Sequence, residues 1–402
     1  MPGPSSSLVV INVNMVRLEL GPDVMRVVLA PDKFRGSLTA RQVADAMAEG
    51  VRLAYPNADV VTLPLADGGE GTAEVLTEAT GGNWYTAPVH DPLGRSISAG
   101  YGISGDGQAT AFIEMAQASG LRLLSATERN PLHASSVGTG ELIQAAIASG
   151  AQRIILGIGG SATNDAGIGM ASALGWRFQD ENGQELPPTG RSLAHISRII
   201  PPTNPIPDGI SISVACDVTN PLAGLNGAAF IYGPQKGANP SMVAELDNGL
   251  VHFANLVKQQ FGVDLADVAG AGAAGGLGAG AMFFLQADLK PGVDVVLDAV
   301  AFEQHVAQAD LVITGEGKMD EQTLQGKLLM GVASRAQKAR VPTIALCGTL
   351  DITPADMDTL GLVAAFSILN RPQTLDEAVT HAYTDLRQAT FAAVRLFFNG
   401  AY

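Results

Sequence analysis

Cysteine is scarce in this sequence, and its scarcity narrows the classes of protein that the chain can encode. Only Cys216 and Cys347 occur, each inside an apolar run that is typical of a strand. Two isolated cysteines argue against a disulfide framework and against a cysteine-rich zinc site. We therefore expect the protein to work in a reducing compartment, the cytoplasm.

Basic residues are also few. The 24 lysines and arginines face 39 aspartates and glutamates, and the formal net charge of −15 argues against a nucleic-acid-binding surface. Charged residues make up only 16% of the chain and hydrophobic residues 47%, a balance typical of globular rather than disordered proteins. Small anionic substrates remain compatible with this charge, because local cations and helix N-termini outweigh a negative surface at short range.

The sequence shows no pattern that predicts secretion or a membrane span. Its first residues lack the basic start, apolar middle and small-residue cleavage pattern of a secretory signal. Residues 268–285 are uncharged and long enough to cross a bilayer, but they include six glycines. We expect a buried, ligand-proximal glycine-rich turn and helix there instead.

The chain does contain apolar strands that alternate with helical patterns. Strand-like runs occupy residues 25–30, 59–65, 153–157, 210–216 and 311–313, and each leads into a loop rich in glycine or polar residues. Such alternation predicts parallel α/β sheets, whose ligands gather beyond the carboxyl ends of the strands. These loops are therefore expected to share one active site.

A chain of 402 residues is too long for a single core. The turn-rich stretches 81–94 and 287–293 are the best candidates for boundaries between domains. We predict an N-terminal extension at 1–24, a discontinuous domain formed by 25–84 and 288–402, and an inserted domain at 85–287.

The segment 314–327 is the most informative part of the sequence. Gly315 and Gly317 follow the buried run 311–313, and glycines at a strand end let the backbone approach a ligand. Charges of both signs surround them, a mixture that suits a magnesium-bound phosphate chain. Taken alone, the segment also fits a glycine-capped turn before a solvated helix, but the recurrence of similar loops favours a shared site.

Phosphoryl transfer requires phosphate-binding N–H groups and cations, carboxylates for magnesium, and a group that takes the acceptor's proton. The sequence offers each type. Glycine-rich phosphate cradles are candidates at Gly159-Gly160-Ser161 and Gly275-Gly276, and the candidate cations are Lys33, Arg35, Lys236, Lys318 and Lys327. The candidate carboxylates are Asp67, Asp165, Asp217, Glu316 and Asp320. Residue types alone do not divide these roles, and a capping or salt-bridging role stays open for each carboxylate.

Two nucleotide-binding signatures were tested against the sequence. Neither Gly317-Lys318 nor Gly326-Lys327 completes a P-loop, which needs a hydroxyl residue after the lysine and an upstream glycine. Residues 270–275 match a dinucleotide fingerprint, but the preceding residues 264–268 make a poor buried strand. A nicotinamide-dependent hydroxypyruvate reductase is therefore the weaker alternative.

Taken together, the ordered motifs closely resemble those of the bacterial type I glycerate kinase family. They run in family order from Met25 to about Gly348. The motifs that carry the resemblance are Ala30-Pro31-Asp32 with Phe34 and Gly36-Ser37-Leu38, Leu65 to Thr72, Gly159 to Asp165, Cys216 to Leu222, Gly233 to Ala238, Gly275 to Gly278, and Thr314 to Lys327.

The resemblance implies ATP-dependent phosphorylation of glycerate with magnesium, by two α/β domains around a central cleft. In the fold that it implies, the discontinuous domain is a Rossmann-like core and the inserted domain is flavodoxin-like. The expected product is 2-phosphoglycerate, with 3-phosphoglycerate as the alternative. Glycerate and ATP are the expected partners, nucleic acid and membrane are not, and homo-oligomer formation stays open.

Residue roles follow from matching the family motifs onto this chain. The predicted catalytic residues are Asp32, Asp67, Asp217 and Asp320, and the predicted metal ligands are Asp217, Glu316 and Asp320. The predicted ATP- and substrate-binding residues are Lys33, Arg35, Gly68, Gly69, Gly159, Gly160, Ser161, Asp165, Asn220, Lys236, Gly275, Gly276, Glu316, Lys318 and Lys327. The first motif departs from the family, which commonly has serine and lysine where Lys33 and Arg35 stand; Arg35 still suits phosphate or carboxylate.

Overall fold

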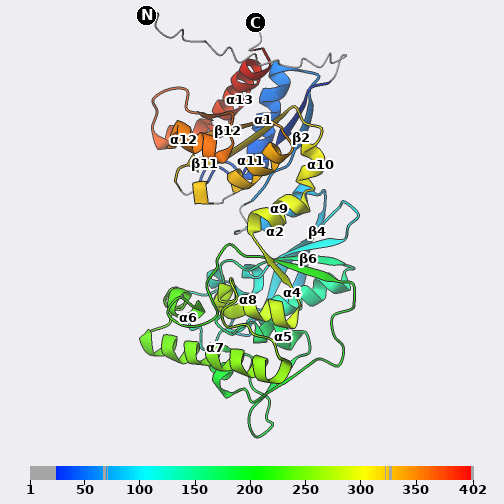
Figure 1. Cartoon of the computed structure of the whole chain (residues 1–402), viewed down its shortest axis with the longest axis vertical. Helices are drawn as coiled ribbons and strands as arrows, with labels where there is room; N and C mark the ends of the chain where they lie inside the picture. The colour runs from blue at the N-terminus through cyan, green and yellow to red at the C-terminus, as the bar shows by residue number, and fades with distance from the viewer. Residues whose placement is uncertain (1–23, 67–68, 70, 322, 326–327, 400–402) are drawn as a thin grey trace, which may run out of the picture.

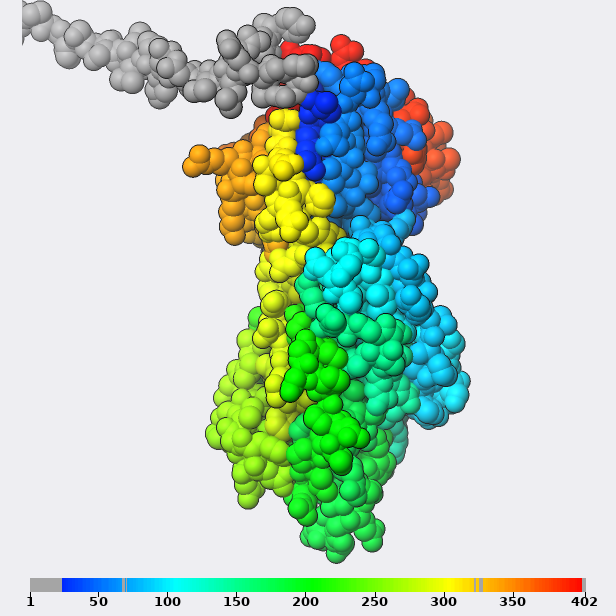
Figure 2. Space-filling view, turned by 90° about the vertical axis from the view of Figure 1, so that its right-hand side faces the viewer, coloured from blue at the N-terminus to red at the C-terminus, as the bar shows by residue number. Residues whose placement is uncertain are grey.

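The structure, a computed structural model, describes residues 24–66, 69, 71–321, 323–325 and 328–399. It has two lobes with a narrower waist between them (Figures 1 and 2). One lobe combines the N-terminal, blue segment with the C-terminal, orange to red segment, and the other holds the cyan to green middle of the chain. Strands and helices alternate, so the α/β fold class is confirmed. The predicted site residues Asp67, Gly68 and Lys327 lie outside the described residues, as does the extension up to residue 23.

A five-stranded parallel sheet lies at the centre of the first lobe, with the strand order β13-β12-β11-β1-β2. Its strands are β1 (Arg26–Leu29), β2 (Asp59–Thr62), β11 (Leu311–Met319), β12 (Thr343–Leu350) and β13 (Ala364–Ser367). The helices and turns of this lobe are α1 (Ala40–Ala54), α10 (Phe302–Val306), η4 (Thr323–Gln325), α11 (Leu328–Lys338), α12 (Pro354–Leu360) and α13 (Leu375–Asn399).

Local sequence explains why α1 begins and how it packs. Thr39 and Gln42 form a capping box, in which each side chain accepts from the other's backbone N–H. Val43, Met47 and Val51 recur at a helical spacing and are all buried against the sheet and α13. The position of α1 therefore follows directly from its capping signal and apolar stripe.

A six-stranded sheet with the order β10-β9-β6-β5-β4-β3 forms the second lobe, and β4 runs antiparallel to its neighbours β3 and β5 while the other pairs are parallel. Its strands are β3 (Asn83–His90), β4 (Ser96–Ile103), β5 (Thr110–Glu114), β6 (Arg153–Gly157), β9 (Ser211–Ala215) and β10 (Asp288–Lys290). A small separate sheet pairs β7 (Arg177–Gln179) with β8 (Arg198–Ile200). The helices around these sheets are α2 (Thr72–Ala79), α3 (Ala116–Ser119), η1 (Leu121–Leu123), α4 (Val137–Ala148), α5 (Ile168–Ala173), η2 (Gly190–His195), α6 (Ala228–Tyr232), η3 (Pro234–Lys236), α7 (Pro240–Phe261), α8 (Ala273–Phe284) and α9 (Gly292–Ala299).

One apolar cluster joins the two sheets. Val28 and Val312 come from the five-stranded sheet, Phe112 and Ile155 come from the six-stranded sheet, and all four belong to the same buried cluster. Helices α2 and α9 contribute to this cluster and lie at the waist (Figure 1). The lobes are therefore packed against each other through a shared apolar layer.

The strand order corrects the labels given to the two predicted domains. Counted along the chain, the five-stranded sheet has the order 2-1-3-4-5, which is flavodoxin-like rather than Rossmann-like. The strands of the six-stranded sheet follow one another in sequence order and β4 runs against the others, so this sheet is not flavodoxin-like. The periodicity of apolar residues does not predict this order. The order depends on which edge of β1 pairs with β11, and β11 follows only after the long middle segment of the chain.

The predicted boundaries also differ from the membership of the sheets. β3 begins at Asn83 and β10 spans Asp288–Lys290, so residues assigned to the discontinuous unit pair within the other sheet. Helix α2 likewise packs on β3, β4 and β5. The turn-rich stretch 81–94 contains strand β3, so membership of the sheets does not change at its end. The division of the chain into two independent domains stays a prediction.

The glycine-rich motif on β11 has a packing role that the sequence did not reveal. β11 continues to Met319 and pairs with β12 throughout, so residues 314–319 form a strand and not a loop. A Cβ added to Gly315 would lie 2.1 Å from the carbonyl oxygen of Leu346. Glycine is therefore required there by the close approach of the neighbouring strand.

The uncharged stretch 268–285 forms a turn followed by the buried helix α8, as predicted. Among the described helices, none is long and apolar enough to cross a membrane.

Candidate active site

The carboxyl ends of β1 and β11 form the first group of predicted site residues. β1 lies between β2 and β11, so the chain leaves β1 on one side and returns on the other, the arrangement at which open α/β sheets bind ligands. Asp32 follows β1, and its backbone N–H donates to the carbonyl oxygen of Gly315 at 2.8 Å. A Cβ added to Gly317 would lie 3.1 Å from the backbone nitrogen of Arg35. The structure therefore places the segment after β1, which includes Lys33, against the β11 motif.

Two predicted metal ligands share one hydroxyl group. Thr323 Oγ1 donates to Glu316 Oε1 at 2.6 Å and accepts from the backbone N–H of Asp320 at 3.2 Å. Lys318 Nζ lies 2.9 Å from Asp320 Oδ2, and this hydrogen bond raises the pKa of Lys318. Glu316 and Asp320 are partly exposed, so this pair of carboxylates is accessible from solvent.

The second group lines a cavity of about 410 Å³ at the carboxyl ends of β6 and β9. Six predicted residues line it, namely Gly69, Gly159, Gly160, Ser161, Asp217 and Lys236. Gly69 comes from the segment after β2, so the chain beyond the five-stranded sheet reaches this cavity. The sequence analysis missed the remaining lining residues, which are Leu121, Ile158, Ala215, Cys216, Val218, Tyr232, Gln235, Ala273 and Ala274.

Lys236 is the buried cation of this cavity. Its side chain is held by two hydrogen bonds, from Nζ to Ser161 Oγ at 2.8 Å and to the carbonyl oxygen of Thr163 at 2.6 Å. Burial lowers the pKa of Lys236 to about 7, although the charge of Asp165 opposes the shift. An anion in the cavity would favour the charged form of this lysine.

Asp165 lies behind the cavity wall rather than in it. Its Oδ2 accepts hydrogen bonds from the backbone N–H and Oγ of Ser136 at 2.8 and 2.7 Å, and its Oδ1 accepts from Gly167 N at 3.1 Å. Burial raises the pKa of Asp165, and these hydrogen bonds oppose that shift. The carboxylate therefore fixes the loop that carries Ser161 and holds a negative charge near Lys236.

Three other predicted residues also support the wall. Asn220 Oδ1 accepts from the hydroxyl of Tyr232 at 2.6 Å and thereby orients a side chain that lines the cavity. Gly275 and Gly276 have left-handed φ values of +71° and +88°, and a Cβ on Gly275 would lie 2.0 Å from the carbonyl oxygen of Thr163. Both glycines are buried and pack against the loop that follows β6, so conformation and packing account for them.

Asp217 both lines the cavity and caps a helix. Its Oδ1 accepts from the backbone N–H of Gly292, the first residue of α9, at 2.7 Å. In the described parts of the chain, no three His, Cys, Asp or Glu side chains gather in a group that could hold a metal ion. The predicted ligands Asp217, Glu316 and Asp320 therefore do not form one preassembled cluster. Sequence analysis could not detect this, because they follow strands of two different sheets.

A second cavity of about 260 Å³ adjoins the first and shares Gly69, Leu121, Gly159 and Gly160 with it. Its other lining residues are Glu114, Ala116, Arg122 and Gly157. Glu114 is the last residue of β5. Like the predicted carboxylates, Glu114 is an acidic residue at the end of a strand. The sequence analysis missed it because residues 110–114 were not recognised as a strand.

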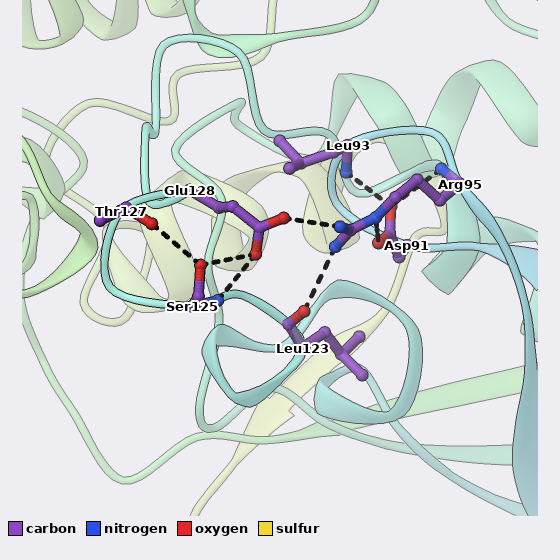
Figure 3. Close-up of polar contacts among 7 residues, drawn as sticks. All are labelled: Asp91, Leu93, Arg95, Leu123, Ser125, Thr127 and Glu128. Atoms are coloured by element: carbon purple, nitrogen blue, oxygen red, sulfur yellow. Dashed lines mark hydrogen bonds and ion pairs between the residues drawn. The ribbon is translucent and has the colours of Figure 1, made fainter.

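A polar network fixes the segment that carries Arg122 (Figure 3). Asp91 is buried and accepts hydrogen bonds from the backbone N–H and the Nε of Arg95. The guanidinium of Arg95 then donates to Glu128 Oε1 at 2.7 Å and to the carbonyl oxygen of Leu123 at 3.3 Å. Arg95, in the turn between β3 and β4, therefore holds Leu123 and Glu128. Leu123 directly follows Arg122, so these contacts fix the backbone next to Arg122.

Comparison with known proteins identifies the family. The sequence model of the glycerate kinase family matches residues 27–398. The chain is 49% identical over 367 residues to glycerate 2-kinase from Escherichia coli K12, covering 91% of this chain and 96% of that protein. It is 48% identical over 364 residues to glycerate kinase from Halalkalibacterium halodurans, covering 90% and 96%. A crystal structure of a candidate glycerate kinase 2 from Salmonella typhimurium LT2 matches with a TM-score of 0.85 and 44% identity, over 94% of this chain and 99% of that one.

The chain belongs to the glycerate kinase family. Its enzyme class is that of a kinase with a small-molecule substrate, and the family resemblance inferred from the motifs is confirmed. Membership of a kinase family implies the use of ATP.

Proposed function

We propose that this protein transfers the γ-phosphoryl group of ATP to D-glycerate and forms 2-phosphoglycerate. The observation that carries the proposal is the cavity at the carboxyl ends of β6 and β9, in which a buried lysine lies beside a glycine-rich backbone. This cavity occurs in a chain whose family match spans nearly its whole length, and the Escherichia coli relative is named for the 2-position.

The residues of the cavity suit a phosphate chain. Lys236 supplies positive charge, and the backbone of Gly159 and Gly160 is open to the cavity. A Cβ added to Gly159 would meet no atom within 4 Å, so this glycine leaves room at the wall. Backbone N–H groups and a cation of this kind stabilise the charge that phosphoryl oxygens carry during transfer.

Magnesium fits the exposed group on β11 better than the buried cavity. Magnesium is usually held by one or two carboxylates together with substrate phosphates and water, and Glu316 and Asp320 provide such a pair around Thr323. When bound, the ion would neutralise phosphate oxygens. Asp32 and Lys33 lie beside this pair and would position the phosphates or the acceptor.

The roles assigned to the two groups require them to act on one ATP molecule. The β11 carboxylates and the β6 and β9 loops belong to different sheets. We propose that ATP and glycerate together draw the two groups closer, which excludes water from the phosphoryl group.

An assay that couples ADP release to a colour change, with each glycerate enantiomer and magnesium, tests the proposed reaction. D-glycerate should support ATP consumption, and NMR of the product should show phosphate on the 2-position. A product phosphorylated on the 3-position would contradict the proposed regiochemistry, but the proposed kinase activity would stand. Folded protein that consumes no ATP with either enantiomer would refute the proposal.

The reductase alternative gains no support from the fold. The fingerprint at residues 270–275 needs a preceding strand, whereas residues 264–268 form turn and irregular backbone. Absence of NADH oxidation with hydroxypyruvate is the expected control result.

A further inference from the structure

Glu114 is a buried carboxylate in which one oxygen accepts a hydrogen bond and the other has no hydrogen-bond partner among the described residues. Its Oε1 accepts from the backbone N–H of Ala73, the second residue of α2, at 2.9 Å. The residue is only 5% exposed, and among the described residues its Oε2 has no hydrogen-bond partner. A buried acceptor left in this state is costly and rare in proteins. Such an atom in a cavity wall indicates a ligand that donates to it.

Electrostatics around Glu114 agree with this interpretation. Burial and the charge of Glu74 raise the pKa of Glu114, whereas the hydrogen bond from Ala73, the nearby backbone N–H of Gly71 and the charge of Arg122 lower it. Arg122 lines the same cavity, so one wall carries a carboxylate and another carries a guanidinium. The remaining lining residues are glycines, Ala116 and Leu121, which leaves these two charges to select the occupant.

We propose that the second cavity is the acceptor subsite, in which Glu114 Oε2 accepts a hydrogen bond from a hydroxyl of glycerate and Arg122 binds its carboxylate. The inference rests on the proposed kinase activity and adds the groups that recognise the acceptor. A hydroxy acid matches both walls, because its hydroxyl donates to the carboxylate while its anion pairs with the guanidinium. ATP lacks this combination at its phosphate end, which would meet Glu114 with like charge.

The position of the cavity agrees with this role. It shares Gly69, Leu121, Gly159 and Gly160 with the larger cavity, so an acceptor in one lies next to phosphates in the other. Its volume of about 260 Å³, against about 410 Å³, suits the smaller of the two substrates. Glu114 Oε1 also holds the start of α2, which follows the segment that contains Gly69, so acceptor recognition is coupled to the wall between the cavities.

The test compares glycerate and ATP dependence in Glu114→Gln and Arg122→Gln. The glutamine retains an oxygen acceptor for Ala73 N and replaces only the oxygen that has no partner among the described residues. Glu181→Gln is the matched control, because Glu181 is exposed in the turn after β7 and lines neither cavity. Arg198→Gln is the control for Arg122, since Arg198 is exposed on β8. Circular dichroism and thermal unfolding establish that each variant is folded.

Loss of a hydrogen bond to a charged group predicts that each site variant raises KM for glycerate about tenfold or more. KM for ATP should stay within about twofold, because the lysine cavity is untouched. Glyceramide, which lacks the anion, should inhibit native enzyme and the Arg122→Gln variant equally. Control variants should match the native enzyme.

Two results would overturn the inference. If Glu114→Gln and Arg122→Gln are folded and keep the native KM for glycerate, this cavity is not the acceptor subsite although the kinase proposal survives. If both variants weaken ATP and glycerate alike, the cavity belongs to the nucleotide site. A native enzyme with no glycerate-dependent ATP consumption would refute the proposed function itself, and the subsite with it.

Discussion

The two groups of strand-end residues differ in how far they are built before any ligand binds. Around β11, Lys318 and Asp320 pair with each other at a partly exposed surface. Around β6, Ser161 and Lys236 are buried, and Lys236 donates to Ser161 Oγ and to the carbonyl oxygen of Thr163. The charged side chains of the first group are accessible and weakly held, whereas the ionisable lysine of the second group is enclosed in a fixed wall.

Because of this difference, we expect the two groups of residues to contribute to catalysis in different ways. A preorganised, buried cation is effective because it needs no reorganisation when phosphate charge develops. Exposed ion pairs contribute little to stability and exchange partners readily, which suits residues that recruit a magnesium-bound nucleotide. We expect substitutions in the buried group to affect both activity and stability, and substitutions in the exposed group to affect activity alone.

The largest loss of activity is expected from Lys236→Met. The substitution keeps a long apolar side chain but removes the cavity's buried cation, and kcat/KM should fall about 100-fold or more. The coupled ADP assay measures the loss, and Lys258→Met is the control because Lys258 is exposed at the end of α7. Equal activity in the two variants would remove Lys236 from the phosphate site.

Asp320→Asn should give the next largest loss of activity. Removal of this proposed magnesium ligand should lower turnover about tenfold to 100-fold while the free energy of unfolding changes by less than about 1 kcal/mol. Asp358→Asn on α12 serves as the control, since Asp358 is exposed. A large loss of stability on urea titration would show that Asp320 is part of the fold rather than of an accessible site.

Ser136→Ala tests the buried group through stability. The hydroxyl donates to Asp165 Oδ2 at 2.7 Å and accepts from the backbone N–H of Met170 at 2.9 Å. Its removal should lower the free energy of unfolding by about 2 kcal/mol. Urea unfolding measures the change, with the exposed Ser241→Ala as control; matching midpoints for the two variants would contradict a supporting role for the Asp165 network.

A smaller effect on activity is expected from Arg95→Met, which removes the side-chain contacts to Asp91, Glu128 and Leu123 shown in Figure 3. Because the segment after η1 is then held less firmly, KM for glycerate should rise about threefold with kcat nearly unchanged. The exposed Arg153→Met is the control. A fall in kcat without a change in KM would contradict a role in positioning Arg122.

Proton uptake on ATP binding should report the state of Lys236 without any change in activity. Its pKa is lowered from 10.5 to about 7, so at pH 8 the free enzyme holds it mostly neutral, and bound phosphates should raise the pKa and add a proton. Cys216 and Tyr232 line the same cavity, but their pKa values are raised from 9.0 and 10.0, so both stay protonated at pH 8. Asp217 is the other acidic group in the wall.

Calorimetry in two buffers of different ionisation enthalpy measures this uptake. The native enzyme should take up nearly one proton per site at pH 8 and almost none at pH 6, where Lys236 is already charged. The Lys236→Met variant should show no uptake at either pH. Uptake that persists in this variant would assign the proton to another group.

Much of the fold could be predicted from local sequence. β6 has the predicted bounds, and α8 is the predicted buried helix. Strand order and the boundaries could not be predicted, because both depend on contacts between segments far apart in the chain, such as the pairing of β10 with β9.

The candidate site was predicted unevenly for a similar reason. Motifs located the cavity residues Ser161, Asp217 and Lys236, since each lies in or next to a loop that follows a strand or helix. The same reasoning grouped Asp165 and Gly275 with them, although burial places both behind the wall. Side-chain packing decides whether a polar residue lines the cavity or lies behind its wall. The spacing of residues along the chain does not predict that packing.

Hydrogen exchange of the two groups of loops is the most direct test of the account. It compares segments 31–37 and 314–321 with segments 157–163 and 216–220 in free enzyme, with a non-hydrolysable ATP analogue, with glycerate, and with both ligands. The account predicts that only the combination strongly protects both groups, because the enclosed cavity and the exposed carboxylates act on one phosphoryl group. Protection by the nucleotide alone that equals protection by both ligands, or protection confined to one sheet, would contradict it.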